Sequence, residues 1–251
     1  GWVPTPPIFA PALEPSAGSW VTWYGLGRSI TQLPAPPSVD SPELEAALDQ
    51  LVDLRVEQTD GQRRAIEIWD LGPGSVTPVG SWIQSTANLM HEQQTPIELQ
   101  TPTLAALTTT LFDTGVAVWA NKYEYMYPRP ITLIRARRAS DWSPSLVTPN
   151  FPSYPSGHAA FSSAAATVLA SLWPERAADF VAGAAEAADS RALAGIHYWF
   201  DDTAGVELGS AVAAEVLKEW NQPSTLEDDT ILDAMDLTRA DARPGDKPPD
   251  K

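Results

Sequence analysis

The sequence predicts an all-α fold in a single domain. In several segments apolar residues recur at helical spacing, and a Ser-Pro or Thr-Pro pair typical of a helix N-terminus precedes two of these segments. No stretch alternates polar and apolar residues over enough positions to predict a strand. The 251 residues, 43% of them hydrophobic, suffice for one sizeable core. We expect one domain over residues 1–251, with a proline-rich arm over about 1–40 and a polar tail over about 223–251.

Proline and helix-cap signals give the order of the expected elements. Residues 1–40 hold eight of the 24 prolines and show no periodicity, so we expect an extended arm lying over the body. Ser41-Pro42 has the form of an N-cap followed by proline at the first helical position, and Thr101-Pro102 repeats it. The first signal opens a helix whose apolar face comprises Leu44, Ala47, Leu48, Leu51 and Leu54. Further helices are expected over about 62–70, 79–92, 101–125, 157–172, 174–193 and 200–220, with a proline-punctuated loop over 131–155.

The net charge and the absence of certain residues limit the classes of partner. A net charge of -16 and a pI near 4.4 argue against nucleic acid and anionic membranes, because both repel an acidic chain. The chain has no cysteine, so it has neither disulfides nor a thiolate metal site. No run of about 18 apolar residues predicts a membrane span. The first residues lack a signal peptide, and we interpret the chain as a secreted or periplasmic protein with its signal removed.

Basic residues are concentrated in one segment of this acidic chain. Five of the sixteen fall within 17 residues: Lys122, Arg129, Arg135, Arg137 and Arg138. Lys122 closes a predicted helix, and Arg129 follows it between two prolines that stiffen the backbone. Rigid placement suits a guanidinium that binds an oxyanion with two parallel hydrogen bonds. Surface salt bridges with the many carboxylates are the alternative, and this segment alone does not exclude them.

A second segment, Pro155-Ser156-Gly157-His158, begins an alanine-rich predicted helix. Ser156 can cap this helix, and the amides of Gly157 and His158 point out of its positive end, where an anion binds readily. Glycine lets a ligand approach the backbone closely. A protonated histidine opposes the helix dipole in the first turn, which indicates an acid–base role for His158. A plain capping turn is the alternative.

The third segment, SRALAGIHYWFD, supplies Ser190, Arg191, His197 and Asp201. His197 and Asp201 are four residues apart, so on a helix the carboxylate would orient the imidazole. The other ring nitrogen would then be available as a nucleophile or a ligand. The chain has three histidines, and we interpret the remaining one, His91, as structural.

Together these segments resemble the signature of type 2 phosphatidic acid phosphatases, bacterial class A acid phosphatases and vanadium-dependent haloperoxidases. The signature runs Lys-x6-Arg-Pro, Pro-Ser-Gly-His and Ser-Arg-x5-His-x3-Asp, and here it reads KYEYMYPRP, PSGH and SRALAGIHYWFD with every spacing intact. The blocks span residues 122–201, about a third of the chain. The resemblance implies a helical bundle of the haloperoxidase and acid phosphatase type.

Aromatic residues favour the haloperoxidase branch over the soluble acid phosphatases. Phe151 lies seven residues before His158, and Trp119 lies three residues before Lys122, as in the haloperoxidase versions of these blocks. The resemblance implies that both aromatics border a halide pocket. Simple packing of aromatic side chains is the alternative reading. The preference for chloride or bromide and the organic substrate stay open.

The resemblance implies a role for each residue of the signature. In a haloperoxidase, His197 would bind vanadium directly, His158 would act as acid and base toward hydrogen peroxide, Asp201 would orient His197, and Lys122 would polarise the bound peroxide. The vanadate oxygens would be held by Lys122, Arg129, Ser156, Gly157 and Arg191. The alternative is a phosphatase that hydrolyses phosphate monoesters, in which His197 attacks phosphorus and His158 protonates the leaving alcohol. A binding protein without catalysis is a third reading.

Two further features stay open on the sequence alone. The carboxylate that would hold the arginines could be Asp113, Asp141 or Glu92. Proline-bearing arms at both ends could embrace a neighbouring copy, which makes a homodimer possible. Small molecules are otherwise the expected partners: hydrogen peroxide, a halide, and an organic acceptor or a phosphate monoester.

Overall fold

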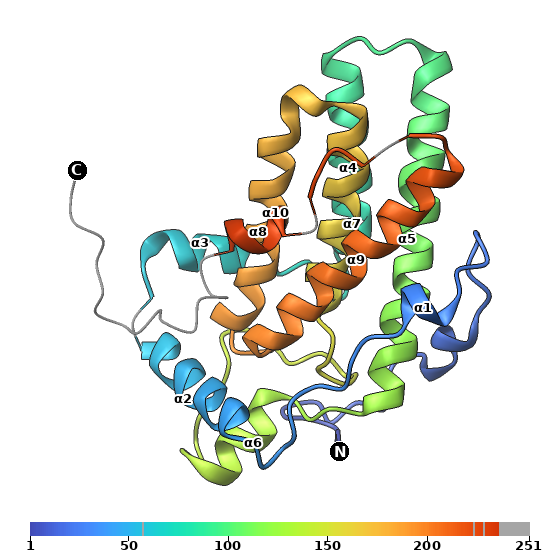
Figure 1. The fold of residues 1–251 in the computed structure, drawn as a ribbon. Helices are drawn as coiled ribbons and strands as arrows, with labels where there is room; N and C mark the ends of the chain where they lie inside the picture. Colours follow the sequence, from blue (N-terminus) through green and yellow to red (C-terminus); the bar gives the residue numbers. More distant parts are fainter. Residues whose placement is uncertain (57, 223, 228, 236–251) are drawn as a thin grey trace.

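The computed structural model describes residues 1–56, 58–222, 224–227 and 229–235. Over these residues its regular secondary structure is helical and contains no strand, which confirms the predicted all-α class (Figure 1). None of the described helices combines the length and apolar character that crossing a bilayer requires.

A bundle of long helices forms the body of the protein (Figure 1). Its members are α4 (Thr77–Glu92), α5 (Ile97–Tyr125), α7 (Gly157–Leu172), α8 (Ala177–Leu193) and α9 (Trp199–Glu219). Helix α7 lies at the centre and contacts α4, α5, α8 and α9. Twelve of its sixteen residues are buried, and six of those are alanines, whose small side chains let neighbouring backbones approach closely.

The contact between α7 and α9 requires glycine at two positions of α9. A Cβ added at Gly205 would lie 2.5 Å from the carbonyl oxygen of Ser156, and one at Gly209 would lie 2.1 Å from that of Ala160. Both distances are far inside van der Waals contact, and the obstructing atoms belong to a backbone that cannot rotate away. This close packing fixes the start of α7 against the start of α9, where two of the three signature segments lie.

We expect Gly209→Ala to destabilise the protein by about 3 kcal/mol, because the added methyl group must push α7 and α9 apart. The measurement is the free energy of unfolding from denaturant titration. Gly183→Ala in α8 is the matched control, because its Cβ would make ordinary contact with Trp82 at 3.5 Å. It should change stability by less than about 1 kcal/mol. Equal stabilities of the two variants would contradict this account of the interface.

The shorter elements correct the sequence-based boundaries at several places. The expected loop over 131–155 contains α6 (Pro130–Arg137), which packs on α2 (Pro42–Val56). Pro130 therefore begins a helix as well as following the end of the previous one, and Ile131 and Ile134 are buried. Helix α5 begins at Ile97, so Pro102 lies inside it rather than at its start, at the loss of one backbone donor.

The arm and the tail also carry short elements. The arm contains η1 (Pro15–Ser19) and α1 (Arg28–Thr31), and the tail contains α10 (Thr230–Ala234); the remaining described elements are α3 (Asp60–Ile68) and η2 (Pro174–Arg176). The arm lies over the body as expected: the Trp2 amide donates to the Met126 carbonyl at 2.6 Å, and η1 packs on α5. Most of the expected polar tail falls on residues 236–251, outside the described residues, and so does most of the C-terminal arm expected to embrace a neighbouring copy.

Candidate active site

The three signature segments meet at one end of the bundle. Lys122 lies in the last turn of α5, Arg129 precedes α6, Ser156 precedes α7, and His197 precedes α9. The Ser156 amide donates to the Asp201 carbonyl at 2.8 Å, which ties the second segment to the third. The site is therefore built mainly at the ends of helices, on backbone that the tight α7–α9 packing holds in place.

Arg129 joins the first segment to the other two and is fully buried. Its Nε donates to the Phe151 carbonyl at 2.9 Å, and its Nη1 donates to the Ile196 carbonyl at 2.7 Å. The same Nη1 lies 2.9 Å from Nε2 of His197. Burial lowers the pKa of Arg129 to about 10, so the guanidinium keeps its charge at neutral pH.

His197 and Asp201 form the pair that their spacing suggested, but not within a helix. His197 lies two residues before α9, and Asp201 lies in the first turn of that helix. The Asp201 carboxylate is 2.9 Å from His197 Nδ1 and also accepts from the Tyr198 amide and the Ser153 hydroxyl. These bonds assign the proton to Nδ1 and leave a lone pair on Nε2, facing Arg129. The orientation comes from the turn that begins α9 rather than from i, i+4 positions of one helix.

Burial also sets the charge states of this pair. It lowers the pKa of His197 well below its usual value, and the neighbouring charges of Arg129 and Lys122 lower it further. The imidazole is therefore neutral, with its lone pair on Nε2. Burial raises the pKa of Asp201 to about 6, while the Ser153 hydrogen bond and Lys122 act in the opposite direction. The carboxylate is consequently ionised at neutral pH and accepts the Nδ1 proton.

Lys122 is fully buried and lies in the wall of the site. Its ammonium donates to the carbonyl oxygens of Pro152, Ser153 and Pro155, which use all three of its protons. Burial and the charge of Arg129 lower its pKa well below the ordinary lysine value. In this arrangement Lys122 holds the segment that leads into α7 and supplies positive charge to the site from behind that segment.

Arg191 and His158 lie close enough in the site for the charge of Arg191 to act on the imidazole. The Arg191 Nε donates to the Ser190 hydroxyl at 3.0 Å, and burial lowers the pKa of this guanidinium to about 10. His158 lies in the first turn of α7, where burial and the charge of Arg191 lower its pKa well below the usual value. The main chain at Trp69 and Asp70 favours its protonated form. The segment after α3 therefore borders the site as well.

Several buried polar atoms of these side chains have no hydrogen-bond partner among the described residues. The nitrogen atoms among them are Nη2 of Arg129, Nη2 of Arg191 and Nε2 of His158, and Oδ1 of Asp201 is a further such atom. Buried polar groups in native proteins are almost always paired, so such a set indicates a ligand that supplies oxygen atoms. Gly157 leaves room on the same side, since a Cβ there would meet nothing closer than the Phe161 ring at 3.7 Å. These features fit a tetrahedral oxyanion such as vanadate or phosphate.

Residues 102–223, which contain all three signature segments, match the family model described as the PAP2 superfamily. The match covers just under half of the chain. Among curated protein sequences, none matches it significantly.

Solved structures share the fold of this chain. The crystal structure of the first bacterial vanadium-dependent iodoperoxidase superposes with a TM-score of 0.80 at 24% identity, over 90% of this chain and 61% of that one. Apo-type and holo-type bacterial vanadium-dependent chloroperoxidases give TM-scores of 0.71 and 0.68, both at 17% identity and over 84% of this chain, or 57% and 56% of theirs. The chain thus spans about three fifths of the length of these structures.

The aromatic residues predicted to border a halide pocket lie together. The rings of Trp119 and Phe151 are 5.2 Å apart with an interplanar angle of 48°. Phe151 lies 5.0 Å from both Lys122 Nζ and Arg129 Cζ, so its ring covers two buried cations. An apolar edge therefore adjoins the buried cations of the candidate site.

None of the carboxylates considered from the sequence contacts the arginines of the site. Asp113 accepts the amides of Trp23 and Tyr24 and so fastens the arm to α5, while Asp141 and Glu92 are exposed. The carboxylates that act on Arg191 are instead Asp202 and Asp70. Asp202 is buried beside Asp201, and its burial raises its pKa well above the usual value. Asp202 directly follows Asp201 of the third segment, and this position could have indicated it from the sequence. Asp70 lies far from the three segments in the sequence, and only the fold brings it to the site.

The other basic residues of the first segment lie outside the site. Arg137 at the end of α6 and Arg138 directly after it form ion pairs with Glu45 of α2, and Arg138 also pairs with Asp49. Arg135 donates to the Trp142 carbonyl and the Ser143 hydroxyl. The predicted concentration of charge thus divides into a buried pair in the site and an exposed group that joins α6 to α2. His91 is exposed on α4 and also lies outside the site.

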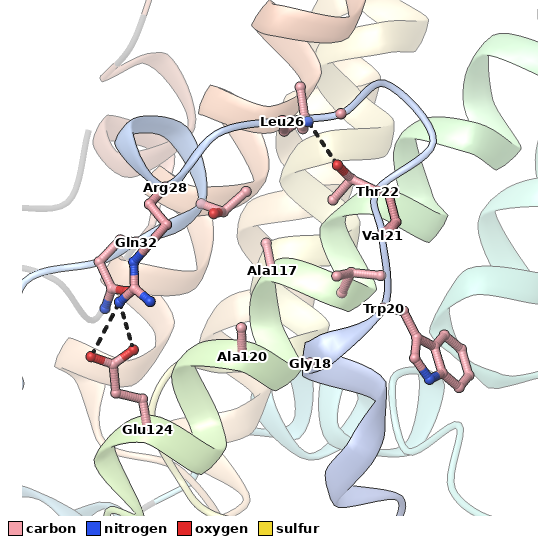
Figure 2. Close-up of a pocket in the computed structure, with 13 residues that line it drawn as sticks. Gly18, Trp20, Val21, Thr22, Leu26, Arg28, Gln32, Ala117, Ala120 and Glu124 are labelled. Atoms are coloured by element: carbon pink, nitrogen blue, oxygen red, sulfur yellow. Dashed lines mark hydrogen bonds and ion pairs between the residues drawn. The ribbon is translucent and has the colours of Figure 1, made fainter.

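A cavity of about 280 Å³ between the arm and α5 is separate from the candidate site (Figure 2). Arg28 and Gln32 of the arm face Glu124 of α5 across it, with an Arg28–Glu124 ion pair at 3.1 Å. None of the signature residues lines this cavity. Its polar groups are already paired with one another, so we assign no chemistry to it.

Proposed function

We propose that the chain is a vanadium-dependent haloperoxidase, which uses hydrogen peroxide to oxidise a halide to hypohalous acid. One observation carries the proposal: the Nε2 lone pair of a neutral, buried His197 lies among three buried cations, Lys122, Arg129 and Arg191. A negatively charged oxyanion with a Lewis-acid centre matches this combination of charge and ligand. The fold shared with vanadium-dependent iodoperoxidase and chloroperoxidase structures supports the same proposal.

Each residue has a role that its contacts allow. His197 would bind vanadium through Nε2, and Asp201 would hold the ring in the required tautomer. Arg129 and Arg191 would donate their unpartnered Nη2 groups to vanadate oxygens, together with the Gly157 amide and the Ser156 hydroxyl. Lys122 would contribute positive charge from behind the loop. When bound, vanadate supplies a Lewis acid that activates peroxide without a change of oxidation state.

His158 is proposed as the acid–base group of the site. Burial keeps its imidazole neutral, and its Nε2 has no partner among the described residues, so this nitrogen can accept a proton from hydrogen peroxide. An anion in the site would oppose the effect of Arg191 and favour the protonated imidazole. His158 could then return the proton as the reaction proceeds.

A phosphatase is the second candidate, because the same lone pair on His197 could attack phosphorus. The pair formed by Trp119 and Phe151 favours the haloperoxidase. A halide is a weakly hydrated anion, so an apolar edge beside cations favours its binding. The same edge contributes little to the binding of a phosphate monoester.

A bromination assay separates the candidates. The metal-free chain is mixed with hydrogen peroxide, bromide and a phenolic dye, with and without added orthovanadate. We expect bromination of the dye only when vanadate is present. Hydrolysis of p-nitrophenyl phosphate that vanadate suppresses, without bromination, would instead favour the phosphatase. Binding of vanadate with neither activity would leave a binding protein.

A further inference from the structure

An apolar groove of about 340 Å³ runs between α4, α5 and α7, beside the candidate site. Its walls include Val79 and Ile83 of α4, Phe112 and Trp119 of α5, and Phe161 of α7. No charged side chain lines it among the residues the structure describes. An ionic ligand would lose its hydration in this groove without gaining an ion pair. The groove therefore favours uncharged ligands, although the chain carries a net charge of -16.

Two aromatic rings connect the groove to the oxyanion site. Trp119, at its inner end, contacts Phe151, whose ring lies 5.0 Å from both Lys122 Nζ and Arg129 Cζ. Phe161 lines the groove and lies 3.7 Å from the place of a Cβ on Gly157, the first residue of α7. A molecule in the groove would therefore lie one aromatic ring away from the groups proposed to hold vanadate.

The outer rim of the groove is apolar as well. Phe112 is 41% exposed and stacks against Trp20 of the arm, with ring centroids 6.3 Å apart. Figure 2 shows the Trp20 ring turned away from Arg28 and Glu124, which lie on the other side of the arm. The polar cavity and the groove thus have separate chemical characters, although Trp20 borders both.

We propose that this groove binds the organic substrate, a small uncharged aromatic molecule with an electron-rich ring. The proposal rests on the haloperoxidase function. Peroxide, halide and a proton give hypohalous acid and water at the oxyanion site. The ring carbon then forms a bond to halogen as the oxygen–halogen bond breaks, and the ring proton leaves with the hydroxide as water. The groove keeps the acceptor where hypohalous acid is formed, so halogenation occurs before the oxidant diffuses away.

The test compares uncharged 2-naphthol with the anion 6-hydroxy-2-naphthalenesulfonate as acceptors for the vanadate-loaded protein with peroxide and bromide. Ile83→Trp fills the groove, and Ile97→Trp, at an exposed site near the start of α5, is the matched control. We expect Ile83→Trp to raise the KM for 2-naphthol at least about tenfold. Bromide-dependent peroxide consumption without an acceptor should change less than about twofold. The Ile97→Trp control should leave the KM for 2-naphthol unchanged. Ile83→Trp should leave the KM for the sulfonate unchanged.

Two further measurements keep the outcome decisive. Phe112→Ala opens the exposed rim without filling the interior, and it should raise the KM for 2-naphthol while its thermal midpoint stays near that of the parent. Calorimetric titration with 2-naphthol alone should detect one binding site that Ile83→Trp removes. Equal KM values for all variants, or no binding of 2-naphthol by a protein that brominates, would overturn the groove assignment. Binding of 2-naphthol without bromination would overturn the haloperoxidase function instead.

Discussion

Replacing His197 with alanine should abolish vanadate binding and reduce turnover by at least about 1,000-fold, the scale expected when the group bonded to the reacting centre is removed. Its Nε2 is the one imidazole nitrogen that Asp201 orients toward the buried cations. The arginines that remain can still attract an anion but cannot form the bond to vanadium. Orthovanadate affinity measured by calorimetry, together with bromination rates, gives the result.

His91→Ala is the control for this substitution. His91 is exposed on α4 and contacts none of the signature residues among the interactions described, so both affinity and rate should equal those of the parent. Vanadate affinity retained in His197→Ala would contradict the proposed bond. The proposed pocket would then be a purely electrostatic anion site.

Arg129→Lys should weaken vanadate binding by about 100-fold although it keeps the charge. The guanidinium donates to the carbonyls of Phe151 and Ile196. Its Nη2 has no hydrogen-bond partner among the described residues and can donate to a ligand. A lysine ammonium cannot make these separate contacts from one nitrogen. Each buried carbonyl left unpaired costs about 1–3 kcal/mol, so the free energy of unfolding should fall as well.

Arg137→Lys is the matched substitution outside the site. Arg137 lies on α6, is partly exposed and pairs with Glu45, and such pairs contribute about 0–1 kcal/mol. Its affinity for vanadate and its stability should stay close to the parent values. An Arg129→Lys protein that binds vanadate as tightly as Arg137→Lys would show that the fork geometry of Arg129 has no role in binding.

The sequence predicted which residues lie together more fully than it predicted the fold around them. Each signature residue belongs to a short block with fixed spacing, and the structure brings the three blocks together at one end of the bundle. Their assigned functions, export of the chain and homodimer formation stay predictions. The local sequence likewise predicted α7 with correct bounds, because its long alanine-rich run starts after Pro155-Ser156 and has a proline beyond its other end, although the Ser156 side chain makes no capping hydrogen bond.

Features that depend on tertiary contacts were missed. Helix α6 follows a proline that local rules assign to a loop, and its burial against α2 decides its structure. The role of Asp70 depends on the segment after α3 returning to α7 and α8, which no local pattern indicates. The requirement for glycine at position 209 likewise depends on how closely α9 approaches Ala160.

Titration of the metal-free chain with orthovanadate is the most direct test of the central claim, that separate segments converge on one tetrahedral anion. Calorimetry should give one binding site per chain, and inorganic phosphate should compete for it, since both anions would use the same donors. Stoichiometric vanadate binding that phosphate cannot displace, or no saturable binding at all, would contradict the claim.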